Sequence, residues 1–394
     1  MNILSKLSAY NERKREGKSM KGKMILLLPL LLLAGCSVQY PPAGSLPAPY
    51  IQEKEQLYLA PPEQTASGFV HGRWMPYMDY GEYMAGRSGE EFRAAVRERY
   101  TAAGADGIDT LYIHVHPCGD AYYRSDIFPP GTYLDGDYDP FGIMTEEAHA
   151  LGLAVHAWIN PLRCQTVEQM DALPESFIVK QWTGSGQAKE VGERWYLDPS
   201  YPEVRQLVCS CAAEILDRYD VEGIHIDDYF YPTTGPEWDR AEFQASGAAD
   251  LAQWRRDNCT AMVKALFDTV REHSSSAEFS ISPQGNIVAD YDTQYADVRL
   301  WGGTPGYCDT IIPQIYYGFL NETCPFEATL HQWEEIVSGS GVKLVVGLAE
   351  YKQGKADKWA GAAGEDEWIS DSGIIDRQKA LTEQSSACGW ALYG

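Results

Sequence analysis

The chain is predicted to be an α/β protein with a (β/α)8 TIM barrel, and three observations lead to this fold class. Eight short segments rich in β-branched and aromatic residues follow one another from residue 69 onward. Helical segments separate them, which is typical of a parallel sheet with crossover connections. Eight parallel strands close a barrel, and about 320 residues suit one with long loops. The competing doubly wound sheet has a glycine-rich turn after its first strand, and this sequence lacks that turn.

Each strand is expected where an apolar segment runs into polar or aromatic residues. The segments are 69–79, 108–117, 153–161, 223–230, 278–286, 309–318, 343–352 and 388–394. The last strand ends at Gly394, so no eighth helix follows it. Either residues 40–68 cover that flank of the barrel, or the sequence is incomplete.

Helices are expected between the strands. Ser88 and Glu91 have the spacing of a capping box, and Pro202 stands where a first helical residue would be. The helical segments are 88–104, 141–152, 202–220, a long region ending near 273, 293–301, 326–339 and 373–386.

The first 36 residues have the composition of a lipoprotein signal. Seven Lys and Arg residues precede the apolar run 25–33, and Ala34, Gly35 and Cys36 follow it. This order is typical of a secretory signal, and the run is too short for an ordinary membrane span. The ending LLAGC resembles a bacterial lipobox, which implies a lipid on Cys36. We expect a signal over 1–36, a Pro-rich flexible tether over 37–67 and the barrel over 68–394, anchored to a membrane outside the cytoplasm.

Charge and cysteine spacing exclude two classes of protein. The net charge is −24, and the first 35 residues hold seven basic and two acidic residues, so the remainder carries −29. Phosphate binding needs the opposite sign, so a nucleic-acid partner is not expected. The eight cysteines after Cys36 form no C-x-x-C pair, so a structural zinc site is not expected.

Polar and aromatic side chains gather at the predicted strand ends, where a TIM barrel carries its function. Side chains alternate across a strand, so His225 shares a face with Asp227, and His114 shares one with His116. Rings, amides, carboxylates and imidazoles together suit a sugar ligand. The strand-end residues are Trp74, Asp79, His114, His116, Asp120, Trp158, Asn160, Arg163, His225, Asp227, Asp228, Ser282, Gln284, Gln314, Tyr316 and Glu350.

Six ordered segments resemble the glycosyl hydrolase-like 10 family of bacterial barrels. They read HVHPCGDAYY, HAWINPLR, WYLDPSYPEVR, GIHIDDYFYP, FSISPQGN and PQIYYG, within about residues 68–352. The resemblance implies a barrel similar to family 10 glycosidases, in a family that includes enzymes acting on peptidoglycan strands stripped of stem peptides. Two positions depart from the family pattern. The second-strand segment, HVHPCGDAYY here, often reads QVRPNGDA in the family, so His114, His116 and Cys118 stand at altered positions. Glu350 stands where members often have a small residue, so it cannot be carried over as a family acid.

The adjacent acids Asp227 and Asp228 are the candidate catalytic pair, because glycoside hydrolysis normally uses two carboxyl groups. We expect Asp227 to be the nucleophile or stabiliser and Asp228 the general acid, with Glu350 in reserve. Alternatively, Asp228 caps the next segment or pairs with Arg163. The residues expected to bind substrate are Trp74, His116, Asp120, Trp158, Asn160, Arg163, His225, Tyr229, Gln284, Gln314 and Tyr316, with His225 also hydrogen-bonding the acids.

A substrate-assisted mechanism is a variant of this hypothesis. GIHID followed by YP is similar to the GIDID…E-YP strand of chitinase-type barrels, in which the sugar's own acetamide attacks. Here Tyr229 stands in place of the glutamate and His225 in place of an aspartate. One acid would orient the acetamide and the other would protonate the leaving oxygen.

Two other classes of function stay open. His114, His116, His156 and His225 could bind a metal beside Asp227, as in a deacetylase or amidohydrolase. A lipid-anchored barrel could also bind surface glycan without cleaving it. The sequence favours a glycoside hydrolase acting on peptidoglycan or a related N-acetylated polysaccharide, with no cofactor.

Overall fold

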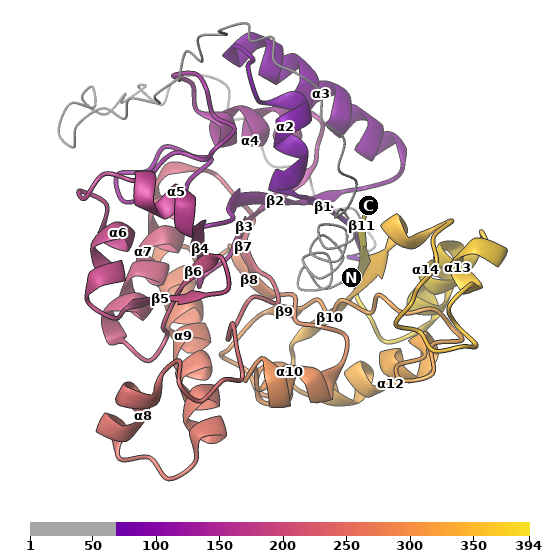
Figure 1. Cartoon of the computed structure of the whole chain (residues 1–394). Helices are drawn as coiled ribbons and strands as arrows, with labels where there is room; N and C mark the ends of the chain where they lie inside the picture. The colour runs from indigo at the N-terminus through magenta and orange to yellow at the C-terminus, as the bar shows by residue number, and fades with distance from the viewer. Residues whose placement is uncertain (1–67) are drawn as a thin grey trace, which may run out of the picture. The chain divides into compact units, whose positions relative to one another are not determined.

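The computed structural model describes residues 68–394, which are organised around a closed barrel of eight parallel strands (Figure 1). The predicted TIM barrel is therefore confirmed. Going round the barrel, the strands are β1 (Val70–Met75), β2 (Thr110–His116), β3 (Ala154–Ile159), β7 (Gly223–Ile226), β8 (Glu278–Ile281), β9 (Thr310–Ile311), β10 (Lys343–Ala349) and β11 (Gly389–Tyr393), which pairs with β1. The predicted signal, Cys36 and the tether lie outside the described residues.

All eight predicted strands are present, but several end early. β7 stops at Ile226, just before the aspartate pair, and β9 has only two residues. Beyond β8 and β9 the chain continues through isolated bridges that join Gln284 to Gln314 and Gln314 to Gly347. Asp227, Gln284 and Gln314 therefore lie just beyond the regular β-strands, at the C-terminal end of the barrel.

The predicted helices form the outer layer, except that two short helices, α10 (Ile287–Thr293) and α11 (Val298–Gly303), replace the single helix expected at 293–301. Ser88 caps the first long helix as expected, because its Oγ accepts from the Glu91 N–H at 3.4 Å and its own N–H donates to Glu91 Oε2 at 2.9 Å. Within residues 68–394, no helix is both long and apolar enough to cross a membrane. The main helices are α3 (Gly89–Ala105), α4 (Pro140–Ala150), α7 (Pro202–Arg218), α9 (Leu251–His273), α10 (Ile287–Thr293), α11 (Val298–Gly303), α12 (Phe326–Val337) and α14 (Ile374–Gln384).

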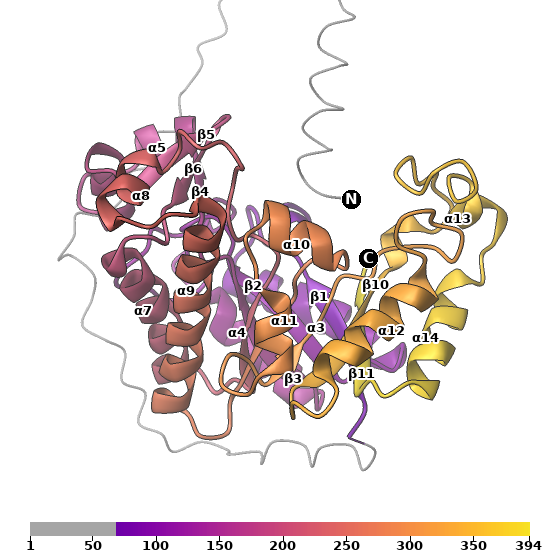
Figure 2. The same cartoon turned by 90° about the horizontal axis from the view of Figure 1, so that it is seen from below.

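A small antiparallel sheet, which the sequence analysis missed, stands at one end of the barrel (Figure 2). Its strands β4 (Arg163–Thr166), β5 (Ala188–Val191) and β6 (Arg194–Leu197) lie in the connection that follows β3. The helices α5 (Val167–Ala172), α8 (Arg240–Ser246) and α13 (Glu367–Ser370) lie at the same end. This is the end at which the barrel strands finish, so these elements surround the predicted site.

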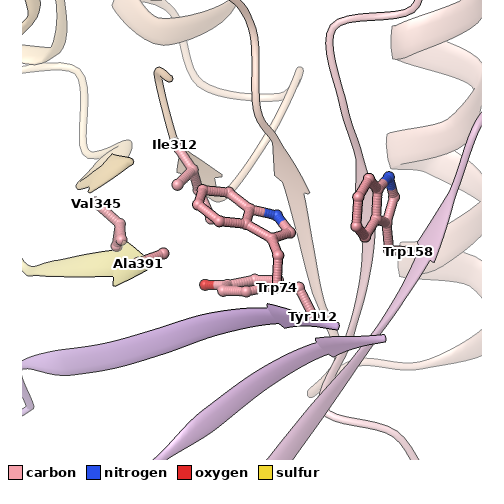
Figure 3. Close-up of a cluster of buried hydrophobic side chains, with 6 residues drawn as sticks. All are labelled: Trp74, Tyr112, Trp158, Ile312, Val345 and Ala391. Atoms are coloured by element: carbon pink, nitrogen blue, oxygen red, sulfur yellow. The ribbon is translucent and has the colours of Figure 1, made fainter. Parts of the chain in front are cut away.

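Large rings fill the barrel interior below that end. Trp74, Tyr112 and Trp158 pack with Ile312, Val345 and Ala391, and all six are at most 5% exposed (Figure 3). Such a filled interior is what an eight-stranded barrel requires. It forms a rigid floor beneath the strand ends.

Gly285 allows two strand ends to approach closely, which leads to a stability prediction. A Cβ there would lie 2.6 Å from the Gln314 carbonyl oxygen and 3.0 Å from Ile315 Cα, and these backbone atoms cannot yield cheaply. Gly285→Ala is expected to lower the free energy of unfolding by about 1–3 kcal/mol in urea denaturation. Gly104→Ala on α3 is the control, because its Cβ would meet only Leu153 at 4.0 Å. Equal stability of the two variants would contradict the steric argument.

Candidate active site

Asp227 and Asp228 follow β7 directly and meet different surroundings. Asp227 is 3% exposed, and its Oδ1 is enclosed without a hydrogen-bond partner in residues 68–394. Asp228 is half-buried. No ion pair within residues 68–394 joins Asp228 to Arg163, so that alternative is not supported.

The two carboxyl groups resist ionisation to different extents. Burial, and then the charge of Asp228, raise the pKa of Asp227 well above its usual value. Burial also raises the pKa of Asp228, but hydrogen bonds from the amides of Gln314 and Gln284 oppose this. Both pKa values are raised, but the amide hydrogen bonds reach only Asp228, so these surroundings favour the proton on Asp227.

Gln284 and Gln314 are held rigidly beside Asp228. The Gln314 Nε2 donates to the Ser282 carbonyl at 3.1 Å, and the Gln284 backbone N–H donates to Asp290 Oδ1 at 3.1 Å. Both glutamines are half-buried. The structure thus brings both predicted glutamines to the aspartate pair.

Asp290 is a buried acid near the site that the sequence analysis missed. It lies on α10 and is fully buried, and its Oδ2 has no partner within the described part of the chain. Burial, and then the charge of Asp228, raise its pKa well above the usual value. Only one sequence signal pointed to it, namely its position six residues beyond Gln284.

Replacing Asp290 should change how stability depends on pH. Because the pKa of Asp290 is higher in the folded protein than in the unfolded chain, protonated Asp290 stabilises the folded state. This contribution to the free energy of unfolding is complete below the ordinary carboxyl pKa, about 3.9, and is lost as the pH rises through the pKa of Asp290 in the folded protein. Asp290→Asn lacks this loss, so its stability relative to wild type should grow with pH, by about 1 kcal/mol or more at pH 8. Urea denaturation of both proteins at pH 5 and pH 8 measures the difference. A difference that does not change with pH would contradict the prediction.

Arg163 and Tyr229 stand together on one side of the aspartates. The Arg163 guanidinium lies 5.0 Å from the ring centre of Tyr229 and 5.9 Å from that of Tyr77. Arg163 is 6% exposed, and its positive charge lowers the pKa of Asp227, although burial outweighs it. Arg163 begins β4 of the small antiparallel sheet, which positions it and which was not predicted from the sequence.

Three further tyrosines lie near the aspartates. The rings of Tyr316 and Tyr393 stack at 6.0 Å with an angle of 19°, and both meet Trp74 edge to face. Tyr351 packs edge to face on both tyrosines. Tyr316 was predicted, whereas Tyr77, Tyr351 and Tyr393 were missed, although each also lies at a strand end.

The predicted contact between His225 and the acids is wrong. His225 is fully buried, and its Nε2 accepts the Trp74 indole N–H at 2.9 Å, so its Nδ1–H donates to Ser280 Oγ at 2.8 Å. With both nitrogens used within the protein, the ring can hydrogen-bond neither Asp227 nor a substrate. Burial lowers its pKa well below the usual value, which keeps the ring neutral.

Trp74 and Trp158 belong to the floor of the site. Trp74 is 3% exposed and its N–H is occupied by His225. Trp158 is 5% exposed and stacks on His114, with ring centres 3.7 Å apart and an angle of 9°. Both tryptophans are therefore buried beneath the site, so their predicted role as exposed rings that stack on a sugar is not supported.

The expectation that His114 and His116 share a face is also wrong. Opposite β3, His114 pairs with Trp158 while His116 pairs with Ile159, so the strand shifts register between the two histidines. This irregularity turns His116 outward against Phe128 and side chains of α7. His116 is therefore not in the site.

Asn160 and Asp120 support the backbone around the site. Asn160 is fully buried, and its Nδ2 donates to the Pro117 carbonyl at 3.0 Å. Asp120 Oδ1 accepts the Cys118 N–H at 2.9 Å, and burial raises its pKa to about 6. Both residues hold the segment after β2 in place.

Glu350 lies apart from the aspartates. Its Oε2 is 3.1 Å from Arg73 Nη2. Neighbouring strand residues point to opposite faces, and Trp74 points into the barrel, so Arg73 and its partner lie on the outer side. The reserve catalytic role expected for Glu350 is not supported.

The four histidines of the metal hypothesis do not converge. His114 stacks on Trp158, His116 faces outward, and His225 is bonded to protein groups. His156 lies deeper, against Tyr112. Within residues 68–394, no three His, Cys, Asp or Glu side chains are placed to hold a metal ion.

Comparison with known proteins agrees with this barrel and its sequence motifs. The model of the glycosyl hydrolase-like 10 family matches residues 88–362. Glycosyl hydrolase DigH of Escherichia coli K12 is 30% identical over 409 residues, covering 91% of this chain and 88% of that one. Glycosyl hydrolase YngK of Bacillus subtilis 168 is 31% identical over 277 residues, covering 62% and 53%.

A solved structure shares the fold at much lower identity. The glycoside hydrolase domain of PgaB (BpsB) from Bordetella bronchiseptica superposes with a TM-score of 0.55 at 12% identity, over 83% of this chain and 94% of that one. The family match covers most of the chain and includes the aspartate pair, the glutamines and Arg163. The chain belongs to the glycosyl hydrolase-like 10 family.

Proposed function

We propose that this protein is a glycoside hydrolase whose chemistry is carried by Asp227 and Asp228. The observation behind this proposal is the pair itself: two neighbouring carboxyl groups at the end of a barrel strand, one enclosed and one held by amides. Family membership and the glycosidase-type fold support the same class of reaction.

The surroundings of the acids assign their roles in the reverse of the order expected from sequence. Asp227 keeps its proton because burial and the neighbouring charge raise its pKa, so it protonates the glycosidic oxygen as the bond breaks. Asp228 ionises more readily, because the amides of Gln314 and Gln284 stabilise its charge. As a carboxylate it supports the positive charge at the anomeric carbon, and water completes the hydrolysis.

We further propose that the substrate is peptidoglycan or a related N-acetylated polysaccharide outside the cytoplasm. The half-buried tyrosines Tyr229, Tyr316 and Tyr393 offer ring faces, and the glutamine amides offer hydrogen bonds to hydroxyl or acetamide groups. The lipobox-like ending at Cys36 would anchor the enzyme where wall glycan is found.

Mass spectrometry of products from peptide-free wall glycan tests this proposal. Wild type should release shorter glycans, each cleavage adding one water and one reducing end. Asp227→Asn should bind the glycan without releasing products. Binding by wild type with no products would favour the non-catalytic function instead. Retention of activity after chelation is also expected, and its loss would favour metal catalysis.

A further inference from the structure

Arg163 is a buried cation without an anionic partner in residues 68–394. It is 6% exposed, yet no carboxylate oxygen lies within 4.0 Å of its guanidinium, and the described part of the chain accepts no hydrogen bond from it. The guanidinium lies over the rings of Tyr229 and Tyr77, and the side chains of Cys118 and Tyr196 are also near it. An uncompensated buried charge is costly, so a protein rarely retains one without a ligand.

Two other arginines in the described part are also buried, and both donate hydrogen bonds to neighbouring groups. Arg255 binds Asp239 through Nε at 2.8 Å and Nη2 at 2.6 Å. Arg256, 8% exposed, donates to Gln253 Oε1 at 3.2 Å and lies 4.0 Å from the ring centre of Tyr291. Of the three buried arginines in residues 68–394, Arg163 is thus the one that donates no hydrogen bond.

The Arg163 guanidinium can be reached from the site. None of its nitrogens is among the fully enclosed polar atoms that lack partners, so they touch open space. It covers Tyr229, the residue that follows Asp228, so it lies beside the place where the bond would be cut. Arg194 on the paired strand β6 adds a second cation, whose Nη1 donates to Cys118 Sγ at 3.3 Å.

The nearby acids do not neutralise this pair of cations. The charges of Arg163 and Arg194 both act on Asp120, but neither arginine forms an ion pair with it. Asp120 is instead bonded to the Cys118 backbone N–H. The positive charge therefore remains available to a bound anion.

We propose that Arg163 binds a free carboxylate on the glycan, close to the bond that is cleaved. This proposal rests on the glycosidase function and names a feature of the substrate. A guanidinium forms two parallel hydrogen bonds with a carboxylate, which gives both affinity and orientation. A neutral sugar, or one whose carboxyl group is converted to an amide, cannot supply that partner. The enzyme should therefore prefer glycans with free acid groups.

The test compares peptide-free peptidoglycan glycan with the same glycan after its carboxyl groups are reduced to alcohols, which removes charge without adding bulk. Binding is measured by calorimetry in an Asp227→Asn background, where cleavage is blocked. The acidic glycan should bind about ten- to a hundredfold more tightly. When Arg163→Gln is added to this background, the ratio of the Kd for the reduced glycan to the Kd for the acidic glycan should fall close to one. Arg256→Gln, a buried arginine outside the site, should leave the ratio unchanged.

Two results would overturn the proposal: equal binding of the two glycans, or a preference that survives Arg163→Gln. Cleavage by wild type separates this failure from failure of the glycosidase function. Equal kcat/KM on both glycans would support hydrolysis and reject the carboxylate site. Preferential binding of the acidic glycan without cleavage would support the site and reject hydrolysis.

Discussion

Asp227→Asn is expected to lower kcat on a natural glycan about a thousandfold while leaving the Kd for the glycan within about threefold. Asparagine keeps the shape of the side chain but has no acidic proton, so the leaving oxygen departs as an alkoxide. Newly formed reducing ends measure kcat, and calorimetry measures Kd. Wild-type activity should persist above the pH at which an ordinary carboxyl ionises, and fall as the pH rises through the raised pKa of Asp227.

An aryl glycoside with an acidic leaving group separates the roles of the two aspartates. Such a group departs without protonation, so Asp227→Asn should lose much less activity on it. Asp228→Asn should lose about as much on both substrates, because charge develops at the anomeric carbon in either case. Equal losses for Asp227→Asn on the two substrates would place the general acid elsewhere.

Arg255→Met is expected to lower the free energy of unfolding by about 3–5 kcal/mol, because it leaves the Asp239 carboxylate buried without its cation. Both side chains of this pair are 0% exposed. Asp239 also accepts from Tyr231 at 2.8 Å, and Arg255 donates to Gly235 O at 2.7 Å. The Arg255–Asp239 pair thereby holds residues 231–239, which follow Asp227 and Asp228 in the chain, in place. Thermal and urea denaturation measure the loss.

Arg256→Met is the matched control, since Arg256 neighbours Arg255 on α9 but has no carboxylate partner in residues 68–394. Arg256→Met should lower the free energy of unfolding clearly less than Arg255→Met does. Combining Arg255→Met with Asp239→Asn should recover part of the loss, because no charge is then left unpaired. A double variant no more stable than Arg255→Met would show that lost packing, and not the unpaired charge, causes the effect.

The barrel could be predicted because its signals are local. Each strand is a short apolar segment with a polar end, and several helices carry their own start signal, such as Ser88 with Glu91. The position of Asp227 and Asp228 followed from the same reasoning, because they come directly after β7. The neighbours of the pair were predicted less well, since a strand end does not show where its side chains point.

The eight-stranded barrel and the strand end that holds the adjacent aspartates are encoded locally, in the period and spacing of residues along the chain. Which side chains lie beside those aspartates is set by three-dimensional packing. An irregularity in β2 turns His116 outward. Both ring nitrogens of His225 are hydrogen-bonded, one to Trp74 and the other to Ser280. A small sheet that was not predicted places Arg163 at the site. These outcomes depend on contacts between residues far apart in the chain, and so does the burial that raises the pKa of Asp227.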